Sequence, residues 1–267
     1  MARYGFIGCG NMGGALARAL CKRVDPAAVL LCDRDIEKAQ ALAAELGCQA
    51  GDSPQAAAAC AYIFLGVKPH MMAEALEPLR PVLAARQDPF LLVSMAAGLS
   101  MERIRDMAGG SYPVLRLMPN TAAQVGESMT LWCTLGASEA LASHVIDALG
   151  DSGKFDRVEE PLLDAGGCIS GCGPAFAYIF LEALADGGVA CGVPRQKARE
   201  YAAQAILGAA RMSLEQGVHT AELKDSVCSP GGSTIEGVQA LEEGGLRAAA
   251  IHAVRVAYEK TMLLSKG

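Results

Sequence analysis

The chain has 267 residues, of which 52% are hydrophobic and 19% are charged, and its formal net charge is −6. This length fits one large domain or two modest ones, and the apolar content excludes a disordered chain. Nucleic-acid-binding proteins usually carry a basic surface, so the negative charge leads us to expect no nucleic-acid partner.

The start of the chain runs directly into a short apolar strand, without the long apolar stretch and cleavage site of a signal peptide. The most apolar helical stretch, Ala175–Leu184, is shorter than the ~20 residues that a membrane span needs. The ten cysteines form no Cys-x-x-Cys pair, so we expect no metal site. These features predict a cytoplasmic protein with no membrane partner, whose cysteines are reduced and mostly buried.

Short apolar runs alternate with helical patterns in the first half of the chain. The runs predict strands that are apolar on both faces, which is typical of a parallel sheet covered by helices on both sides. The predicted strands are Tyr4–Ile7, Val29–Cys32, Tyr62–Val67, Phe90–Met95, Val114–Met118 and Met129–Thr134, and the first predicted helices are Met12–Arg23 and Ile36–Leu46.

The strand patterns end near residue 160, and helical patterns follow. Pro174 and Pro194 suit first helical turns, where the missing N–H is harmless. We therefore predict an α/β domain over residues 1–160 and an all-helical domain over 161–267, with the boundary within Val158–Asp164. The predicted helices are Pro174–Ala190, Pro194–Glu215, Thr220–Val227 and Gly245–Leu264, with another that begins at Thr234.

Gly8, Gly10 and Gly13 form a GxGxxG pattern between the first strand and the first helix. In this position the pattern indicates a Rossmann-type dinucleotide-binding domain. The glycines permit a tight turn and a close approach of the backbone to a pyrophosphate, and the helix N-terminus stabilises its charge. A glycine-rich turn without a ligand is the alternative.

Asp33 and Arg34 follow the second strand and favour different cofactors. An aspartate here can hold the ribose 2′-hydroxyl of NAD, whereas an arginine can hold the 2′-phosphate of NADP. Asp33 also suits the N-cap of the next helix. We expect NADPH to be preferred, because Arg34 offers a charge-assisted phosphate contact, with NADH as a possible second donor.

Two segments of the second half are rich in small and hydroxyl residues. One is SGCGPAF at Ser170–Phe176, and the other is LKDSVCSPGGSTI at Leu223–Ile235. The second predicts a turn with several free backbone N–H groups beside a helix N-terminus, which is a suitable seat for a small carboxylate. A plain connection between two helices, with Ser and Thr caps, is the alternative.

These two segments resemble those of the pyrroline-5-carboxylate reductases. The resemblance continues at Gly66–His70, Ala96–Gly98 and Met118–Thr121, in the same order along essentially the whole chain. It implies an oxidoreductase that reduces 1-pyrroline-5-carboxylate to L-proline with NAD(P)H, the last step of proline biosynthesis. It also implies a homodimer formed through the helical domains, which in this family often assembles further into decamers.

The resemblance also implies the site residues. Thr234 is the implied catalytic residue, whose hydroxyl would hydrogen-bond the ring nitrogen of the substrate. The implied substrate contacts are Glu160, Ser226, Val227, Ser229, Gly231, Gly232, Ser233 and Thr234. The implied cofactor contacts are Ile7, Gly8, Cys9, Gly10, Asn11, Met12, Gly13, Asp33, Arg34, Ser53, Gly66, Val67, Lys68, Pro69, Met95, Ala96, Ala97 and Asn120.

Three residues depart from the family pattern. Cys172 and Cys228 replace hydroxyl residues, and a thiol is a weaker donor, so we expect weaker substrate binding if either contacts the substrate. Ala122 replaces a proline, which predicts a looser turn after Asn120.

The reduction of a cyclic imine needs a hydride, a proton for the nitrogen and a fixed carboxylate. If the nitrogen binds as an iminium, Thr234 would orient it, and if it binds as a neutral imine, Thr234 would relay a proton. We favour orientation, because a threonine hydroxyl is a poor acid. Glu160 would balance the iminium charge, or it is an exposed residue of an acidic pair with Glu159. Lys68 follows a strand end, so we assign it to the cofactor.

Two other functions compete with this interpretation. A β-hydroxyacid dehydrogenase would need a lysine on the helix after Gly171, but the next lysine is Lys197. A nucleotide-binding regulatory protein would not need a second small-molecule site such as the Ser- and Gly-rich turn.

Overall fold

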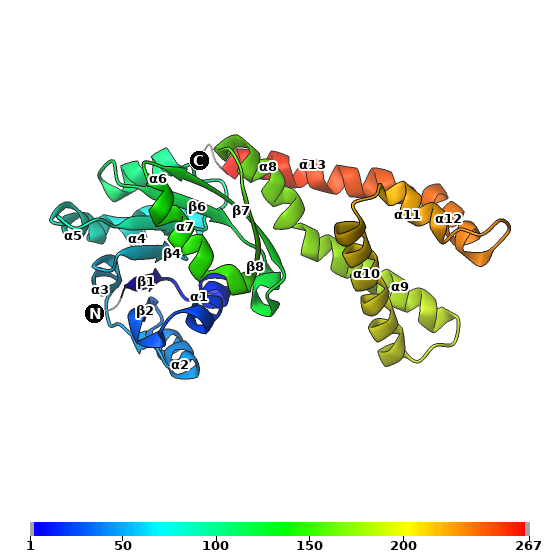
Figure 1. Cartoon of the computed structure of the whole chain (residues 1–267), viewed down its shortest axis with the longest axis horizontal. Helices are drawn as coiled ribbons and strands as arrows, with labels where there is room; N and C mark the ends of the chain where they lie inside the picture. Colours follow the sequence, from blue (N-terminus) through cyan, green and yellow to red (C-terminus); the bar gives the residue numbers. More distant parts are fainter. Residues whose placement is uncertain (1–2, 265–267) are drawn as a thin grey trace. The chain divides into compact units, whose positions relative to one another are not determined.

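The computed structural model of the protein describes residues 3–264 (Figure 1). The chain divides into two compact units. Residues 3–172 and 257–264 form the first unit, and Gly173–Val256 form the second. The predicted domain boundary after residue 160 lies where helix α8 (Glu160–Ser170) begins, before the first unit's continuous segment ends at Cys172. This boundary stays a prediction.

Within the described residues, the first unit contains one eight-stranded sheet with the order β3-β2-β1-β4-β5-β6-β7-β8. The strands from β3 to β6 pair in parallel, as predicted. Strand β7 is antiparallel to β6, contrary to the prediction, because only a short turn joins the two and a parallel pair needs a longer crossover. The strands are β1 Tyr4–Ile7, β2 Val29–Cys32, β3 Gln49–Ala50, β4 Tyr62–Leu65, β5 Leu91–Ser94, β6 Val114–Met118, β7 Ser128–Leu135 and β8 Gly153–Arg157.

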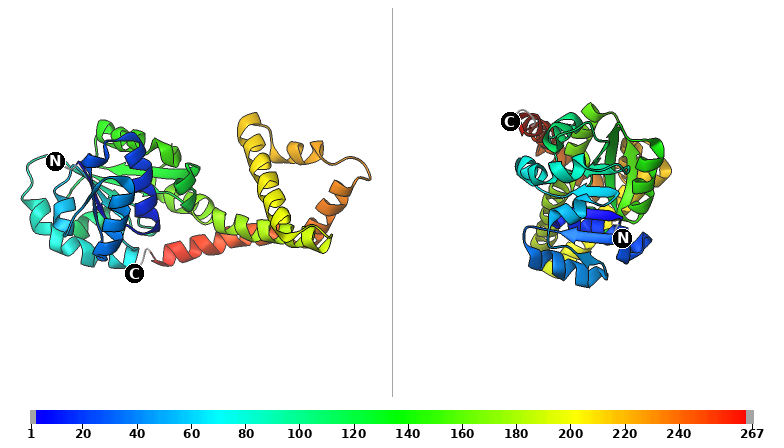
Figure 2. Two further views of the ribbon diagram at one scale, coloured as in Figure 1. Left: turned by 90° about the horizontal axis from the view of Figure 1, so that it is seen from below. Right: turned by 90° about the vertical axis from the view of Figure 1, so that its left-hand side faces the viewer.

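Helices cover both faces of this sheet (Figures 1 and 2). On one face, Leu16 and Leu20 of α1 and Val145 of α7 pack with the strands into one hydrophobic cluster. On the other face, a second cluster contains side chains of α3 to α6 and of α8. The helices are α1 Asn11–Arg23, α2 Ile36–Leu46, α3 Pro54–Ala58, α4 Met72–Leu76, α5 Arg80–Ala84, α6 Met101–Ala108, α7 Glu139–Ala148 and α8 Glu160–Ser170.

All ten cysteines are free thiols. Most of those outside the predicted site are buried or half-buried, as expected for small core residues. Cys191 is exposed, contrary to that prediction, because it lies in the turn after α9.

The second unit contains helices but little core. Helices α9 and α10 lie side by side (Figure 1), and among the described residues of the unit only Ala185, Ala198 and Ala202 are buried. Helix α12 begins at Ser233, one residue before the predicted start. The helices are α9 Gly173–Ala190, α10 Arg195–Gln216, α11 Thr220–Ser226, α12 Ser233–Glu243 and α13 Leu246–Leu264, the last of which continues into the first unit.

One helical run, Glu160–Ala190, is long and apolar enough to cross a membrane on length and composition alone. It is longer than the stretch considered in the sequence because α8 leads almost directly into α9. Only 11% of its most apolar window is buried, so this run leaves a large apolar surface in the single chain.

Candidate active site

The glycine turn lies between β1 and the N-terminus of α1. Gly8 adopts a φ of 99°, which favours glycine, and a Cβ on Gly8 would lie 2.8 Å from the carbonyl carbon of Gly66. A Cβ on Gly13 or Gly66 would overlap the carbonyl oxygen of Gly8. Gly10 is the N-cap of α1 and faces open space. The turn therefore packs tightly against the end of β4, while its Gly10 side and the first N–H groups of α1 stay open to a ligand.

A cavity of about 470 Å³ opens beside this turn, at the carboxyl ends of β1, β2 and β4. Ligands of open α/β sheets bind at this edge of the sheet. The predicted cofactor residues that line the cavity are Ile7, Gly8, Gly10, Asp33, Arg34, Gly66, Val67 and Lys68. The cavity thus gathers residues that lie far apart in the sequence, and it fits the phosphate-containing part of a dinucleotide.

Asp33 is already bound to the backbone. Its Oδ2 accepts a hydrogen bond from the N–H of Cys9 at 2.6 Å, and its Oδ1 accepts one from the N–H of Asp35 at 3.0 Å. Asp33 is not the N-cap of α2, contrary to the prediction; Asp35 is, and it accepts from the N–H of Lys38. Both Asp33 oxygens therefore hold the glycine turn and the following loop in place.

Lys38 is a cavity residue that the sequence reasoning missed. It lines the cavity with Arg34, and both side chains are exposed. The available signal was a second cation just after Arg34, in the first turn of the helix that follows β2. Both cations are suited to contact a phosphate group, and the cavity lining also contains the carboxylates Asp33, Asp52 and Glu74.

The thiol of Cys9 is buried beneath the turn. Burial raises the pKa of this thiol to about 12, and the neighbouring Asp33 carboxylate adds to the rise. The Sγ donates to the carbonyl oxygen of Cys32 at 3.6 Å. Cys9 is therefore a neutral packing residue of the turn rather than a reactive thiol.

The other predicted cofactor residues lie outside this cavity. Ser53 precedes α3, between the cavity residues Asp52 and Pro54. Met95, Ala96 and Ala97 follow β5, where all three pack against the core. The remaining residues of this group are Cys9, Asn11, Met12, Gly13, Pro69 and Asn120.

Asn120 follows β6 and is 8% exposed. Its Oδ1 accepts from the N–H of Ala122 at 2.9 Å, and its Nδ2 donates to the carbonyl oxygen of Ser170 at 2.8 Å. Ala122 donates here a hydrogen bond that a proline cannot donate, and the predicted loosening of this turn stays a prediction. Asn120 therefore connects its turn to the end of α8.

The predicted substrate turn lies in the second unit, between α11 and α12. Ser226 Oγ donates to the carbonyl oxygen of Leu223 at 2.7 Å, and Ser229 accepts from the N–H of Gly232 at 3.0 Å. Gly231 has a φ of 66°, and Gly232 is an N-cap without a side chain. The turn therefore leaves the first N–H groups of α12 without a side-chain cap, beside the exposed Ser233 and Thr234.

The two cysteines at hydroxyl positions are both half-buried. Cys228 lies within the substrate turn, and Cys172 is the last residue of the continuous part of the first unit. Their effect on substrate affinity stays a prediction.

Glu160 lies in the first unit, at the start of α8. Its Oε1 accepts from the N–H of Met101 at 2.7 Å and pairs with Arg116 at 3.2 Å. It is thus a partnered carboxylate rather than an exposed member of an acidic pair. The sequence reasoning missed Arg116, although a single arginine within the apolar strand Val114–Met118 was a visible signal.

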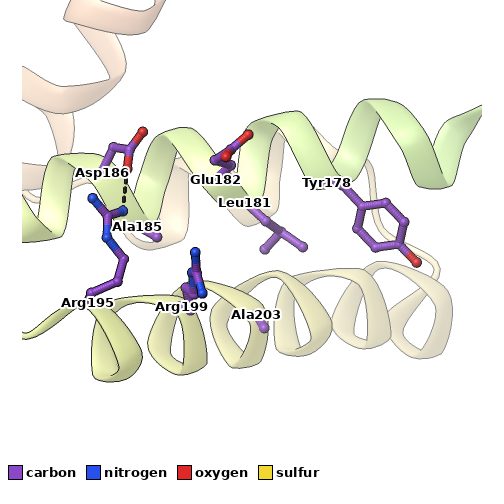
Figure 3. Close-up of a pocket in the computed structure, with 8 residues that line it drawn as sticks. All are labelled: Tyr178, Leu181, Glu182, Ala185, Asp186, Arg195, Arg199 and Ala203. Carbon is purple, nitrogen blue, oxygen red and sulfur yellow. Dashed lines mark hydrogen bonds and ion pairs between the residues drawn. The ribbon is translucent and has the colours of Figure 1, made fainter.

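A second cavity, of about 600 Å³, lies between α9 and α10 (Figure 3). Arg195 forms an ion pair with Asp186 at one end of it, and Glu182 and Arg199 face it from the two helices. None of the predicted site residues lines this cavity. Within residues 3–264, no group of three or more His, Cys, Asp and Glu side chains is arranged to hold a metal ion.

Both halves of the chain match known families. Residues 160–264 match the family described as pyrroline-5-carboxylate reductase dimerisation, and residues 3–98 match the family described as NADP oxidoreductase coenzyme F420-dependent. The pyrroline-5-carboxylate reductase of Escherichia coli K12 is 39% identical over 269 residues, covering 99% of this chain and 98% of that protein. The pyrroline-5-carboxylate reductase of Methanosarcina acetivorans is 36% identical over 268 residues, with the same coverage.

Solved structures extend the similarity to the fold. A crystal structure of Plasmodium falciparum pyrroline carboxylate reductase with NADP bound has a TM-score of 0.89 at 28% identity, covering 99% of this chain and 98% of that chain. The 1-pyrroline-5-carboxylate reductase of Streptococcus pyogenes has a TM-score of 0.88 at 30% identity, covering 97% and 98%. The similarity therefore includes both the glycine turn and the Ser- and Gly-rich turn.

Proposed function

The chain belongs to the pyrroline-5-carboxylate reductase family, and from this premise we propose that it reduces 1-pyrroline-5-carboxylate to L-proline, the last step of proline biosynthesis. The observation that carries this proposal is the similarity over 99% of the chain. A relative that shared only the nucleotide-binding part would support hydride transfer in general but would not indicate this substrate.

We propose NADP as the cofactor, bound at the cavity beside the glycine turn. The open Gly10 side and the uncapped N-terminus of α1 suit a pyrophosphate. Arg34 and Lys38 would hold the 2′-phosphate, which favours NADPH over NADH. When bound, the reduced nicotinamide supplies the hydride for the C=N carbon. Asp33 would act mainly on the shape of the turn, because both of its oxygens accept backbone hydrogen bonds.

We propose that the turn before α12 holds the substrate. The uncapped N–H groups at the start of α12 would bind the substrate carboxylate, which the positive end of a helix dipole also attracts. The exposed hydroxyl of Thr234 would then hydrogen-bond the ring nitrogen. This contact orients a protonated iminium, or it relays a proton to a neutral imine.

We propose that the working form is at least a homodimer. The region that matches the dimerisation family covers residues 160–264, and this region leaves many large apolar side chains exposed in the single chain. Such surface usually marks an interface. A second copy of the helical unit would cover it, and a decamer would be an assembly of such dimers. We also propose a cytoplasmic location, in which the free cysteines stay reduced.

The direct test is to measure NADPH oxidation by the purified protein when 1-pyrroline-5-carboxylate is added, and to identify the product. We expect stoichiometric L-proline. Turnover of β-hydroxy acids with NADP⁺ instead would indicate a dehydrogenase. Binding of NADPH without turnover of either substrate would indicate a regulatory protein.

A further inference from the structure

Arg116 is a buried charge in the middle of the sheet. Its side chain is 1% exposed, and it pairs with Oδ1 of Asp164 at 2.5 Å and with Oε1 of Glu160 at 3.2 Å. Within the described residues its Nε has no hydrogen-bond partner. The desolvation of such a cluster often costs as much as its ion pairs return, and an apolar replacement of similar volume is often at least as stable. Stabilisation of the fold is therefore a weak explanation for an arginine at this buried position.

The cluster joins three elements of the first unit. Arg116 belongs to β6, and both of its carboxylate partners belong to α8. Glu160 Oε1 also accepts from the N–H of Met101 at 2.7 Å, which opens helix α6. Since one carboxylate contacts both Arg116 and Met101, a shift of α8 would move the start of α6 as well.

The other end of α8 is held by a second contact. The Nδ2 of Asn120, just beyond β6, donates to the carbonyl oxygen of Ser170 at 2.8 Å. Helix α8 is thus attached to the β6 region at its first turn and at its last residue. We call the contacts of Arg116, Glu160, Asp164 and Asn120 the α8 clamp.

The α8 clamp includes Asn120, which the family resemblance implies to lie near the nicotinamide, and it also holds the start of the helix that follows three further implied cofactor contacts. Met95, Ala96 and Ala97 lie on the loop that leads to α6, and Asn120 is itself a member of the clamp. The cavity that fits the phosphates lies elsewhere, at β1, β2 and β4, and none of the clamp residues lines it. The clamp can therefore affect the nicotinamide end while leaving the binding of the adenosine end unchanged.

We propose that Arg116 is a positioning residue for the reduction. Through Asp164 and Glu160 it fixes α8 and the start of α6, and so sets the geometry of the loop and of Asn120, without contact with the reacting atoms. This inference rests on the proposed function. Small errors in the placement of reacting groups lower a rate strongly even when they leave binding intact.

The test is the double variant R116M/D164N. It removes the two most buried charges of the cluster at nearly constant volume and leaves Glu160 to accept from Met101. We expect a melting temperature close to that of the wild type and unchanged affinity for 2′,5′-ADP, a probe of the adenosine end. We expect kcat to fall by about 10- to 100-fold. The fluorescence emission of NADPH should also change less on binding to this variant than on binding to the wild type. R116K, which keeps the charge, should recover part of kcat.

The matched control is R157M, which breaks the exposed ion pair of Arg157 with Glu139 and should leave kcat and emission unchanged. Wild-type kcat and wild-type emission in R116M/D164N would overturn the proposal, as would an equal loss of 2′,5′-ADP affinity, which indicates a merely structural role. Absence of reductase activity in the wild type would contradict the proposed function instead. The fluorescence emission of bound NADPH tests the role of the α8 clamp whether or not the wild type has reductase activity.

Discussion

The first unit of this chain encloses two hydrophobic clusters, one on each face of its sheet. The second unit buries only three alanines among its described residues. Its larger apolar side chains, such as Tyr178, Ile179 and Leu214, are 63%, 69% and 70% exposed. Both units contain regular secondary structure, so the difference lies in packing. The first unit encloses its hydrophobic core within the single chain, whereas the second unit leaves many large apolar side chains exposed.

The same difference explains the apolar run Glu160–Ala190. Its length and composition would allow it to cross a membrane, but it falls within the match to the dimerisation family. A second copy of the helical unit can cover an apolar surface as a lipid bilayer can. We therefore expect a second copy to cover the exposed apolar side chains of the second unit, and the first of the predictions below tests this directly, while the others test the sites of the two units.

The largest effect is expected from Ile179→Asp on α9. If Ile179 is covered by a second copy, both copies lose its burial, about 1.5–3 kcal/mol each, and gain an unpaired buried charge. The dimer dissociation constant should rise by about 100-fold or more. Light scattering at several concentrations measures this change, and activity should be lost in parallel.

Val125→Asp is the matched control, because Val125 is an apolar side chain of the first unit that is 75% exposed. This variant should keep the assembly of the wild type. Equal dissociation of both variants would remove the distinction between the two units.

The next effect is expected from Thr234→Ala. Loss of one hydrogen bond to the substrate should lower kcat/KM by about 10- to 100-fold, or ~1.4–3 kcal/mol. NADPH binding should stay unchanged, because it belongs to the first unit. Thr234→Ser keeps the hydroxyl and should retain most of the activity. Wild-type kinetics in the alanine variant would exclude the proposed role of Thr234.

A smaller effect is expected from Arg34→Ala and Lys38→Ala, which lie in the first unit. Each should raise KM for NADPH by about tenfold, or ~1.4 kcal/mol, through the loss of a charge-assisted contact. KM for NADH should change much less, because NADH has no 2′-phosphate. Steady-state kinetics with both donors measures the ratio, and equal changes would place these side chains away from the phosphate.

The smallest effect concerns His144, which lies in the first unit away from the cavity. Tyr4 Oη lies 2.7 Å from its Nε2, and its ring stacks on Tyr62. Burial, and next the charge of Arg3, lower the pKa of His144 below its usual value, while Asp147 acts in the opposite direction. The folded state thus favours the neutral ring. Its contribution to stability is complete above the unfolded pKa near 6.5 and is lost as the pH falls through the lower folded pKa.

The check is urea unfolding at about pH 8 and about pH 5. The free energy of unfolding of the wild type should decrease more toward acid than that of His144→Phe, which keeps the stacked ring but does not titrate. Equal decreases in the two proteins would assign the pH dependence to other groups.

The sequence predicted the parts of the fold whose signals are local. Apolar runs indicated six of the strands, and the glycines indicated the turn, because only glycine suits the φ of Gly8 and the contact of Gly13 with Gly8. The direction of β7 was not predictable from apolar runs, because an apolar strand looks the same in both directions. The length of its connection to β6 held the missing information.

The candidate site was predictable to different degrees in the two units. The cofactor residues follow strand ends, so topology alone brings them together at one edge of the sheet. The contacts of Glu160 with Arg116 and Met101 were not predictable, because these partners are distant in sequence, and its proposed contact with the substrate stays a prediction. The free hydroxyl of Thr234 and its helix N-terminus were expected from the turn sequence. The residues that would surround them in an oligomer are not indicated by the sequence.

The most direct test of the unequal cores is the mass of the active species. Sedimentation velocity with detection of NADPH oxidation in the moving boundary measures mass and activity together. We expect the activity to sediment with a species of at least twice the 27.6 kDa chain mass. Full activity in a stable species of 27.6 kDa would contradict the account, because the second unit would then function without a partner to complete its core.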